Sequence, residues 1–385
     1  MIHSMQNPIT VAILGVVAER SAFGRLKGRQ LESLGMRKRR RQFHAVRSAK
    51  LGSTSPPRRR KTSLILVFIS AWLMLGCGGP QSTLDPAGRG AEQITELFWW
   101  SVAVNLLIWL FVIGLAVYAT WAQPGGHRHR KANLLIIGGG AVFPTLVLTV
   151  YLIYGLALLP GLLAPAPEGS LQIAVLGEQW WWRVRYHPQG GEPVELANEI
   201  RLPVGKPVDL FLASPDVIHS LWIPSLTGKM DMIPGRVNRL TLEATKTGVY
   251  RGICAEYCGS AHALMKFDVV VMEPDAFAAW LEHQAQPASM PQRAEARGRE
   301  LFLIHGCSAC HTVRGTPAEG KVGPDLTHVG SRVSLGAGIL PNEPAAFLRW
   351  IAHTEAVKPG VHMPAFGMLP RKDLQALAVF LEGLE

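Results

Sequence analysis

Two long apolar runs constrain this chain more than any other feature. They extend from Leu97 to Trp121 and from Leu134 to Leu159, and each exceeds the roughly 20 residues that a helix needs to cross a bilayer. Aromatic side chains lie towards the ends of both runs, where membrane proteins place an interfacial belt. They are Trp99, Trp100, Trp121, Tyr151 and Tyr154. The runs predict a transmembrane helix hairpin over residues 97–160, and a buried helical pair in a soluble protein is the alternative.

The short loop between the two runs predicts the orientation of the hairpin. Residues 125–131 read Gly-Gly-His-Arg-His-Arg-Lys, and short basic loops stay on the cytoplasmic side of a membrane. We therefore expect residues 77–96, an external N-terminal segment, and everything after Pro160 to lie on the outer face.

Residues 1–76 are expected to form a basic disordered extension followed by an export signal. The chain has a net charge of +11, and residues 1–61 alone contribute +13. Arg58–Lys61 and the apolar run Leu64–Leu75 have the pattern of a signal peptide. The run ends at Cys77 in a sequence that resembles a bacterial lipoprotein cleavage box, which would make Cys77 a lipid anchor. An uncleaved membrane anchor with an incidental cysteine is the alternative. Because the positive charge belongs to the leader, a nucleic-acid partner is not expected.

Soft metal ligands are concentrated in the twelve residues from Cys254 to Met265. Cys258 and His262 lie between them, so thiolate, imidazole and thioether donors occur close together. This mixture favours copper, although a two-Cys, two-His structural zinc site tolerates a similar cysteine spacing.

Residues 168–275 alternate short apolar runs with Pro and Gly, a pattern typical of an all-β Greek-key domain. The expected strands are 171–175, 180–186, 208–213, 240–243, 249–253 and 267–272. The cysteine-rich segment would then lie on a loop between two strands. An incomplete metal site needs another imidazole, and His219, just after a strand, can supply it.

His219 in an Asp-Val-x-His-Ser context, together with the Cys254–Met265 segment, resembles the binuclear CuA site of cytochrome c oxidase subunit II. The hairpin followed by an exported cupredoxin-like domain resembles the architecture of that subunit. The resemblance implies that Cys254 and Cys258 bridge two coppers and that His219 and His262 each bind one. It also implies weak ligation by Met265 and by the Glu256 carbonyl, with the Glu256 side chain facing a magnesium shared with the catalytic subunit.

Three further segments bear on this resemblance. Gly177–Trp182 matches the aromatic segment of the family, in which Trp180 aligns with an exposed tryptophan where an electron enters; a core or bilayer role for the three tryptophans is the alternative. Lys229–Arg236 matches a loop facing the catalytic subunit. The family often carries a glutamate early in its second helix, but residues 133–143 contain no carboxylate, which puts a proton-channel role in doubt.

The sequence predicts a short helix over 274–283, and residues 276–292 comprise the end of that helix and a linker. A second cofactor signature follows the linker. Cys307-Ser-Ala-Cys310-His311 is the attachment motif of haem c, with His311 as an iron ligand. The preceding helix, 294–305, and a closing helix, 373–384, predict an all-α class I cytochrome c domain over 293–385. A redox disulfide is the alternative for the cysteine pair.

Met363 is the favoured second axial ligand of the haem iron, because His362–Phe366 resembles the methionine segment of cytochromes c. Met368 is the rival, and His362 or His353 would give bis-His ligation with a lower potential. The Pro324 carbonyl is expected to orient His311.

The sequence thus predicts a multidomain membrane protein resembling the oxidase subunit II that carries a fused cytochrome c domain. Such a subunit would take electrons from external cytochrome c or a cytochrome bc complex and pass them through haem c and CuA to subunit I, which reduces oxygen, with subunit III also in the complex. We expect it in the bacterial inner membrane, in contact with lipid, with both cofactor domains on the periplasmic face. The alternatives are a CuA subunit of a nitric oxide reductase and a membrane-anchored copper or electron carrier.

Overall fold

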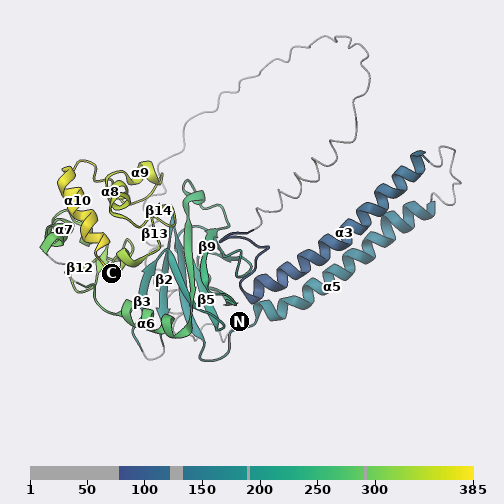
Figure 1. Ribbon diagram of the computed structural model, residues 1–385, viewed down its shortest axis with the longest axis horizontal. Helices are drawn as coiled ribbons and strands as arrows, with labels where there is room; N and C mark the ends of the chain where they lie inside the picture. The colour runs from purple at the N-terminus through teal and green to yellow at the C-terminus, as the bar shows by residue number, and fades with distance from the viewer. Residues whose placement is uncertain (1–77, 122–132, 189–190, 290–292) are drawn as a thin grey trace, which may run out of the picture.

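The computed structural model describes residues 78–121, 133–188, 191–289 and 293–385. Figure 1 shows an elongated molecule with a helical hairpin at one end, a β-sandwich in the middle and a small helical domain at the other end. The expected fold class, a membrane hairpin with a cupredoxin-like domain and a cytochrome c domain, is confirmed. The leader, Cys77 and the basic loop at 125–131 lie outside the described residues.

The hairpin consists of two antiparallel helical segments that run side by side (Figure 1). Helix α3 spans Arg89–Trp121, and the second segment combines the π-helix η3, Leu135–Val142, with the α-helix α5, Phe143–Leu163. The mean hydropathy of their apolar windows is 2.4 and 2.2, and none of those window residues is buried within the chain. A core helix of a soluble protein would bury such side chains, so these helices anchor the chain in a membrane.

The middle domain is a sandwich of two five-stranded sheets, with strand orders β3-β2-β1-β5-β8 and β4-β10-β9-β6-β7. Strands β1 and β5 are parallel, as are β4 and β10, and the remaining neighbours are antiparallel. The strands are β1 (Leu171–Glu178), β2 (Trp181–His187), β3 (Val194–Ala197), β4 (Glu199–Pro203), β5 (Pro207–Ala213), β6 (His219–Trp222), β7 (Met230–Met232), β8 (Asn238–Glu243), β9 (Gly248–Cys254) and β10 (Lys266–Met272).

Alternating apolar residues hold the two sheets together. Along β2, Trp182, Val184 and Tyr186 are fully buried, and Trp182 packs on Phe267 of β10 with ring centroids 4.9 Å apart. This period of two places every second side chain in the core. Removing such a core aromatic ring costs about 3–5 kcal/mol of folding free energy.

The segment before the hairpin lies against the sandwich. The amide of Ala87 donates to Ser225 O at 2.7 Å, and Ala87 O accepts from the amide of Thr245 at 2.7 Å. Gly88 approaches so closely that an added Cβ would lie 2.4 Å from Leu226 O. These contacts fix the base of α3 on the rim of the β-domain.

The C-terminal domain is built on the crossing of its first and last helices, α7 (Arg293–Ile304) and α10 (Arg371–Glu382). At the crossing, a Cβ on Gly298 would lie 2.1 Å from Ala376 O, while Phe302 and Phe380 pack with centroids 5.7 Å apart. Helix α6 (Pro274–Ala285) connects this domain to the sandwich. The smaller elements are η5 (Cys307–Ala309), β11 (Thr312–Val313), β12 (Ala318–Glu319), η6 (Val329–Ser331), β13 (Ser334–Leu335), β14 (Leu340–Pro341), α8 (Pro344–Ala352) and α9 (Thr354–Val357).

Candidate metal centres

Strands β6, β9 and β10 bring the first group of predicted ligands together. His219 is the first residue of β6 and Cys254 the last residue of β9, and these strands pair at Leu221 and Cys254. The β9–β10 loop carries Cys258, the short helix η4 (His262–Leu264) and Met265. A hydrogen bond of 3.0 Å from Cys254 N to Met265 O closes this loop at its base.

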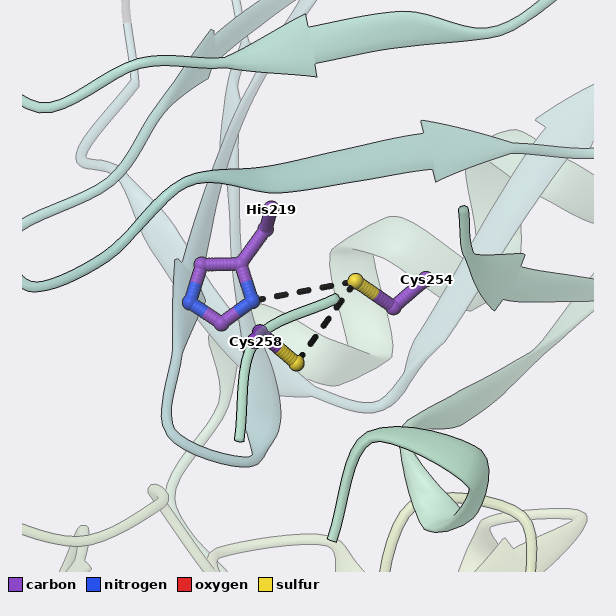
Figure 2. A group of neighbouring side chains, drawn as sticks. All are labelled: His219, Cys254 and Cys258. Carbon is purple, nitrogen blue, oxygen red and sulfur yellow. Dashed lines mark hydrogen bonds between the residues drawn. The ribbon is translucent and has the colours of Figure 1, made fainter. Parts of the chain in front are cut away.

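Sulfur and nitrogen atoms converge where this loop meets β6 and the end of β9, as Figure 2 shows for His219, Cys254 and Cys258. The two sulfurs lie 3.8 Å apart, and Cys254 Sγ lies 3.8 Å from His219 Nδ1. Cys258 Sγ is 3.5 Å from His262 Nδ1 and 3.8 Å from Met265 Sδ. A disulfide would need about 2 Å between the sulfurs, so both thiols are free to bind metal.

The backbone of Glu256 also faces this sulfur cluster. Cys254 Sγ lies 3.2 Å from Glu256 O. Among the described residues, His219, Cys254 and Cys258 are the group of three metal-binding side chains that lie within reach of one ion. The Glu256 carboxylate is not a member of that group.

Asp216 orients His219, a role that the sequence reasoning missed. His219 Nε2 lies 2.9 Å from Asp216 Oδ1, which leaves Nδ1 directed at Cys254. On the other side of the ring, a Cβ on Gly177 would lie 2.9 Å from His219 Cγ, so Gly177 allows the close approach. An aspartate three residues before a ligand histidine is the sequence signal that could have identified it, because ligand histidines commonly bond a carboxylate through their second nitrogen.

The pKa shifts within the group show which protons a metal ion would have to displace. Burial lowers the pKa of His219, but hydrogen bonds with Asp216 and Cys254 outweigh burial and raise that pKa to about 9. A hydrogen bond with Cys258 lowers the pKa of Cys254 to about 3, while the same contact raises the pKa of Cys258. One thiol of the pair is therefore already a thiolate. A metal ion that displaces the protons of Cys258 and of His219 Nδ1 would meet two thiolates and two imidazoles, which suits copper.

The second group of predicted ligands lies in the C-terminal domain. His311 Nδ1 bonds Pro324 O at 2.8 Å, as expected, which leaves Nε2 for iron. A Cβ on Gly323 would lie 2.5 Å from His311 Cε1, so this glycine provides space for the ring. Burial lowers the pKa of His311 and keeps the imidazole neutral, the form that binds metals. Cys307 and Cys310 are free thiols on the adjacent turn.

The two candidate axial methionines differ in their surroundings. Met363 is half-buried against the core of the domain, and its carbonyl accepts from Thr354 Oγ1 at 3.0 Å. Met368 is 77% exposed. The rivals His353 and His362 are both exposed. The donors present thus fit a covalently attached haem with a histidine and a methionine on its iron.

The expectation that Trp180 is exposed is wrong. Its side chain is only 6% exposed, because the C-terminal domain covers it. The ring lies between two glycines, with a Cβ on Gly259 or on Gly360 coming within 2.9 or 3.0 Å of it. Trp180 Nε1 donates to Cys258 O at 2.9 Å, and its ring centroid lies 6.4 Å from that of His362. Trp180 therefore contacts both groups of candidate ligands.

Comparisons with known proteins agree with these two centres. The family model for the cytochrome c oxidase subunit II periplasmic domain matches residues 187–273, and that for cytochrome c matches residues 295–385. Cytochrome c oxidase subunit 2 of Alkalihalophilus pseudofirmus is 32% identical over 339 residues, which cover 84% of this chain and 96% of the relative. The chain belongs to the cytochrome c oxidase subunit II family.

Other subunit II proteins are similar over much or part of the chain. The Bacillus subtilis subunit 2 is 28% identical over 349 residues, which cover 84% of this chain and 97% of that protein. The solved periplasmic domain of subunit II from Bradyrhizobium japonicum is 34% identical, covering 31% of this chain and 96% of that domain, with a TM-score of 0.29. Membership of the subunit II family together with a cytochrome c domain implies copper and haem as cofactors, in a membrane-anchored protein.

Proposed function

We propose that this subunit II receives electrons from an external donor at haem c and passes them through CuA to the haem–copper subunit that reduces oxygen. The observation that carries the proposal is Trp180, which joins the two candidate centres within one chain. It donates to Cys258 O on one side and packs against Gly360, three residues before Met363, on the other. A copper carrier would have no use for this contact with a haem-binding loop.

The copper site is proposed to be binuclear. Cys254 and Cys258 would bridge the two coppers, and His219 and His262 would each bind one of them. The pairing of each sulfur with a different imidazole, at 3.8 and 3.5 Å, supports this assignment. Met265 and the Glu256 carbonyl would be the weak outer ligands, each lying near one sulfur. When bound, the coppers supply a one-electron redox centre, and the closed ligand set excludes substrate.

The haem is proposed to be held by thioethers to Cys307 and Cys310, with His311 and Met363 on the iron. The partly buried position of Met363 supports its choice over Met368. Pro324 holds the His311 ring through its carbonyl, and this hydrogen bond increases the basicity of the ligand.

Trp180 is proposed as the place where the copper domain receives an electron. In this chain the electron would come from the attached haem domain, because that domain covers the tryptophan. Burial of the ring excludes water from the contact and fixes the ring relative to both candidate ligand groups.

We infer that the cofactor domains lie on the periplasmic face of a bacterial inner membrane, in a complex with subunits I and III. The short basic loop between the membrane helices supports this orientation. Lys229–Arg236 would face the catalytic subunit, and the Glu256 carboxylate would contact a shared magnesium. External cytochrome c or a cytochrome bc complex would be the donor.

Electron paramagnetic resonance of the purified full chain tests the copper assignment. A mixed-valence binuclear copper signal, together with the optical spectrum of low-spin haem c, is the expected result. A mononuclear, exchangeable copper signal would instead identify a copper carrier. Gas consumption by the purified complex then separates oxygen from nitric oxide as the acceptor.

A further inference from the structure

A lysine is buried at the contact between the haem domain and the copper domain. Lys358 is only 2% exposed, although lysine is rarely buried to this extent. Its Nζ donates to Trp180 O at 2.5 Å and to Gly336 O at 2.9 Å. Gly336 belongs to the haem domain and Trp180 to the copper domain, so one ammonium group joins the two domains.

Lys358 belongs to the segment that leads to the candidate axial methionine. It follows α9, with its amide bonded to Thr354 O at 2.8 Å, and Thr354 Oγ1 in turn donates to Met363 O. On the other domain, Trp180 donates to the carbonyl of Cys258. Lys358 is thus placed to set how the Met363 segment lies on the tryptophan that contacts the copper ligands.

Other contacts around this point bring the domains together without touching the Trp180 backbone. The amide of Val333 donates to Glu199 Oε2 at 2.7 Å, and the amide of Lys266 donates to Ala337 O at 3.2 Å. Ser260 Oγ donates to Pro359 O at 3.2 Å. These bonds lie around the contact and can serve as local reporters of whether the domains remain docked.

Burial of Lys358 has a cost that the docked arrangement helps to offset. Burial lowers the pKa of Lys358 to about 7, which reflects the loss of water around the ammonium group. Two carbonyl acceptors replace part of that water, and the one at Trp180 is present only when the domains are in contact. A lysine that only stabilised the haem domain would not need a hydrogen-bond acceptor in the copper domain.

We propose that Lys358 is a positioning residue that fixes the haem domain on the copper domain in a single orientation, with the Met363 segment held against Trp180. The electron-transfer consequence rests on the function proposed above, but the docking itself does not. Without the Nζ donor, the Trp180 and Gly336 carbonyls would lose a charged partner inside the interface, and the undocked state would gain population.

The test is Lys358→Met in the full chain, which keeps an unbranched side chain that is shorter only by the terminal nitrogen and removes its donors. Backbone hydrogen exchange at the amides of Val333 and Lys266 should become about tenfold faster, while exchange of the α10 amides stays unchanged. Transfer of an electron from the haem to the copper, followed after rapid reduction of the haem, should also become about tenfold slower. Lys372→Met, at an exposed position of α10, is the matched control.

Three outcomes would overturn the proposal. Unchanged exchange at both reporter amides would mean that Lys358 does not hold the domains together. Faster exchange in α10 as well would mean that it stabilises the haem domain itself. Faster exchange at the reporters with an unchanged electron-transfer rate would remove its positioning role. If the unsubstituted chain shows no haem-to-copper transfer at all, the proposed function fails, whereas the exchange result still tests docking.

Discussion

At the scale of single residues, the copper site depends on groups that bind no metal. Asp216 holds the His219 ring through Nε2, and it also accepts a hydrogen bond from the backbone amide of Gln179 at 2.7 Å. These bonds fix one imidazole in a site whose other candidate ligands all come from one loop.

Asp216→Asn should therefore weaken copper binding by about 10–100-fold, the usual effect of losing such a supporting carboxylate. Competition with a chelator, measured on the full chain, gives the affinity. Asp275→Asn, at an exposed position on α6, is the control and should change nothing. Equal affinities for the two variants would contradict the orienting role.

The two methionines near the C-terminus give a second residue-scale prediction. Met363→Ala should abolish methionine ligation and lower the reduction potential of the haem, because a weaker or different ligand replaces the thioether. The haem should stay attached, since Cys307 and Cys310 are unchanged. Optical and paramagnetic resonance spectra report the ligation. Met368→Ala, at a 77% exposed side chain, should leave the spectra unchanged. If Met368→Ala changes the spectra and Met363→Ala does not, Met368 is the axial ligand.

At the scale of elements, close helix packing holds the haem domain together. Gly298→Ala would place a methyl group 2.1 Å from Ala376 O and 2.5 Å from Phe380 Cβ, so α7 and α10 would have to move apart. The expected loss of folding free energy is about 1–3 kcal/mol.

Thermal unfolding of the full chain, followed at the haem absorption, measures that loss. Gln375→Ala changes an exposed residue on α10, the helix that packs against α7, and is the control. An unchanged unfolding temperature for Gly298→Ala would mean that the two helices can separate at no cost.

The elements with strong periodic patterns were predictable from the sequence, and the short ones were not. Strands β1, β2, β5, β8, β9 and β10 lie at or near the expected short apolar runs bounded by Pro and Gly, and α7 and α10 are close to their expected ranges. Strands β3, β4, β6 and β7 were missed, because runs of three to five residues carry little periodicity. His219, which was expected just after a strand, is the first residue of β6.

The candidate ligands could be found from their spacing, but their surroundings could not. Cys254 ends β9, and Cys258 and His262 follow on the next loop, so local sequence already brings them together. The burial of Trp180 depends on Lys358 and Gly360, which follow it by well over a hundred residues. A local motif carries no information about which distant segment will cover it.

At the scale of the whole molecule, one loop of the haem domain packs so closely against the copper domain that an added methyl group would clash. Gly360 has φ +81°, and a Cβ there would lie 2.6 Å from Ser260 Oγ and 3.0 Å from Trp180 Cη2. Gly360→Ala should therefore separate the domains and expose Trp180 to water.

Oxidative footprinting of Trp180 in the full chain measures this exposure, and its reactivity should rise about tenfold or more if the docked state loses roughly 1.4 kcal/mol. Gly205→Ala is a matched control, because Gly205 has φ +68° but no atom near its missing Cβ. It imposes similar backbone strain without crowding an interface. Equal reactivity of Trp180 in both variants would show that the contact at Gly360 does not hold the domains together.

The covered tryptophan also changes how the copper would be supplied with electrons. A free carrier would have to find Trp180 by diffusion, at a rate that depends on its concentration and on ionic strength. The attached domain occupies that surface already, so its effective concentration there is set by the chain itself. On the proposed route, reduction of the copper would be a first-order event that salt hardly changes, since buried contacts are poorly screened. Sensitivity to salt and to donor concentration would then be confined to the outer surface of the haem domain, where the proposed external donor would bind.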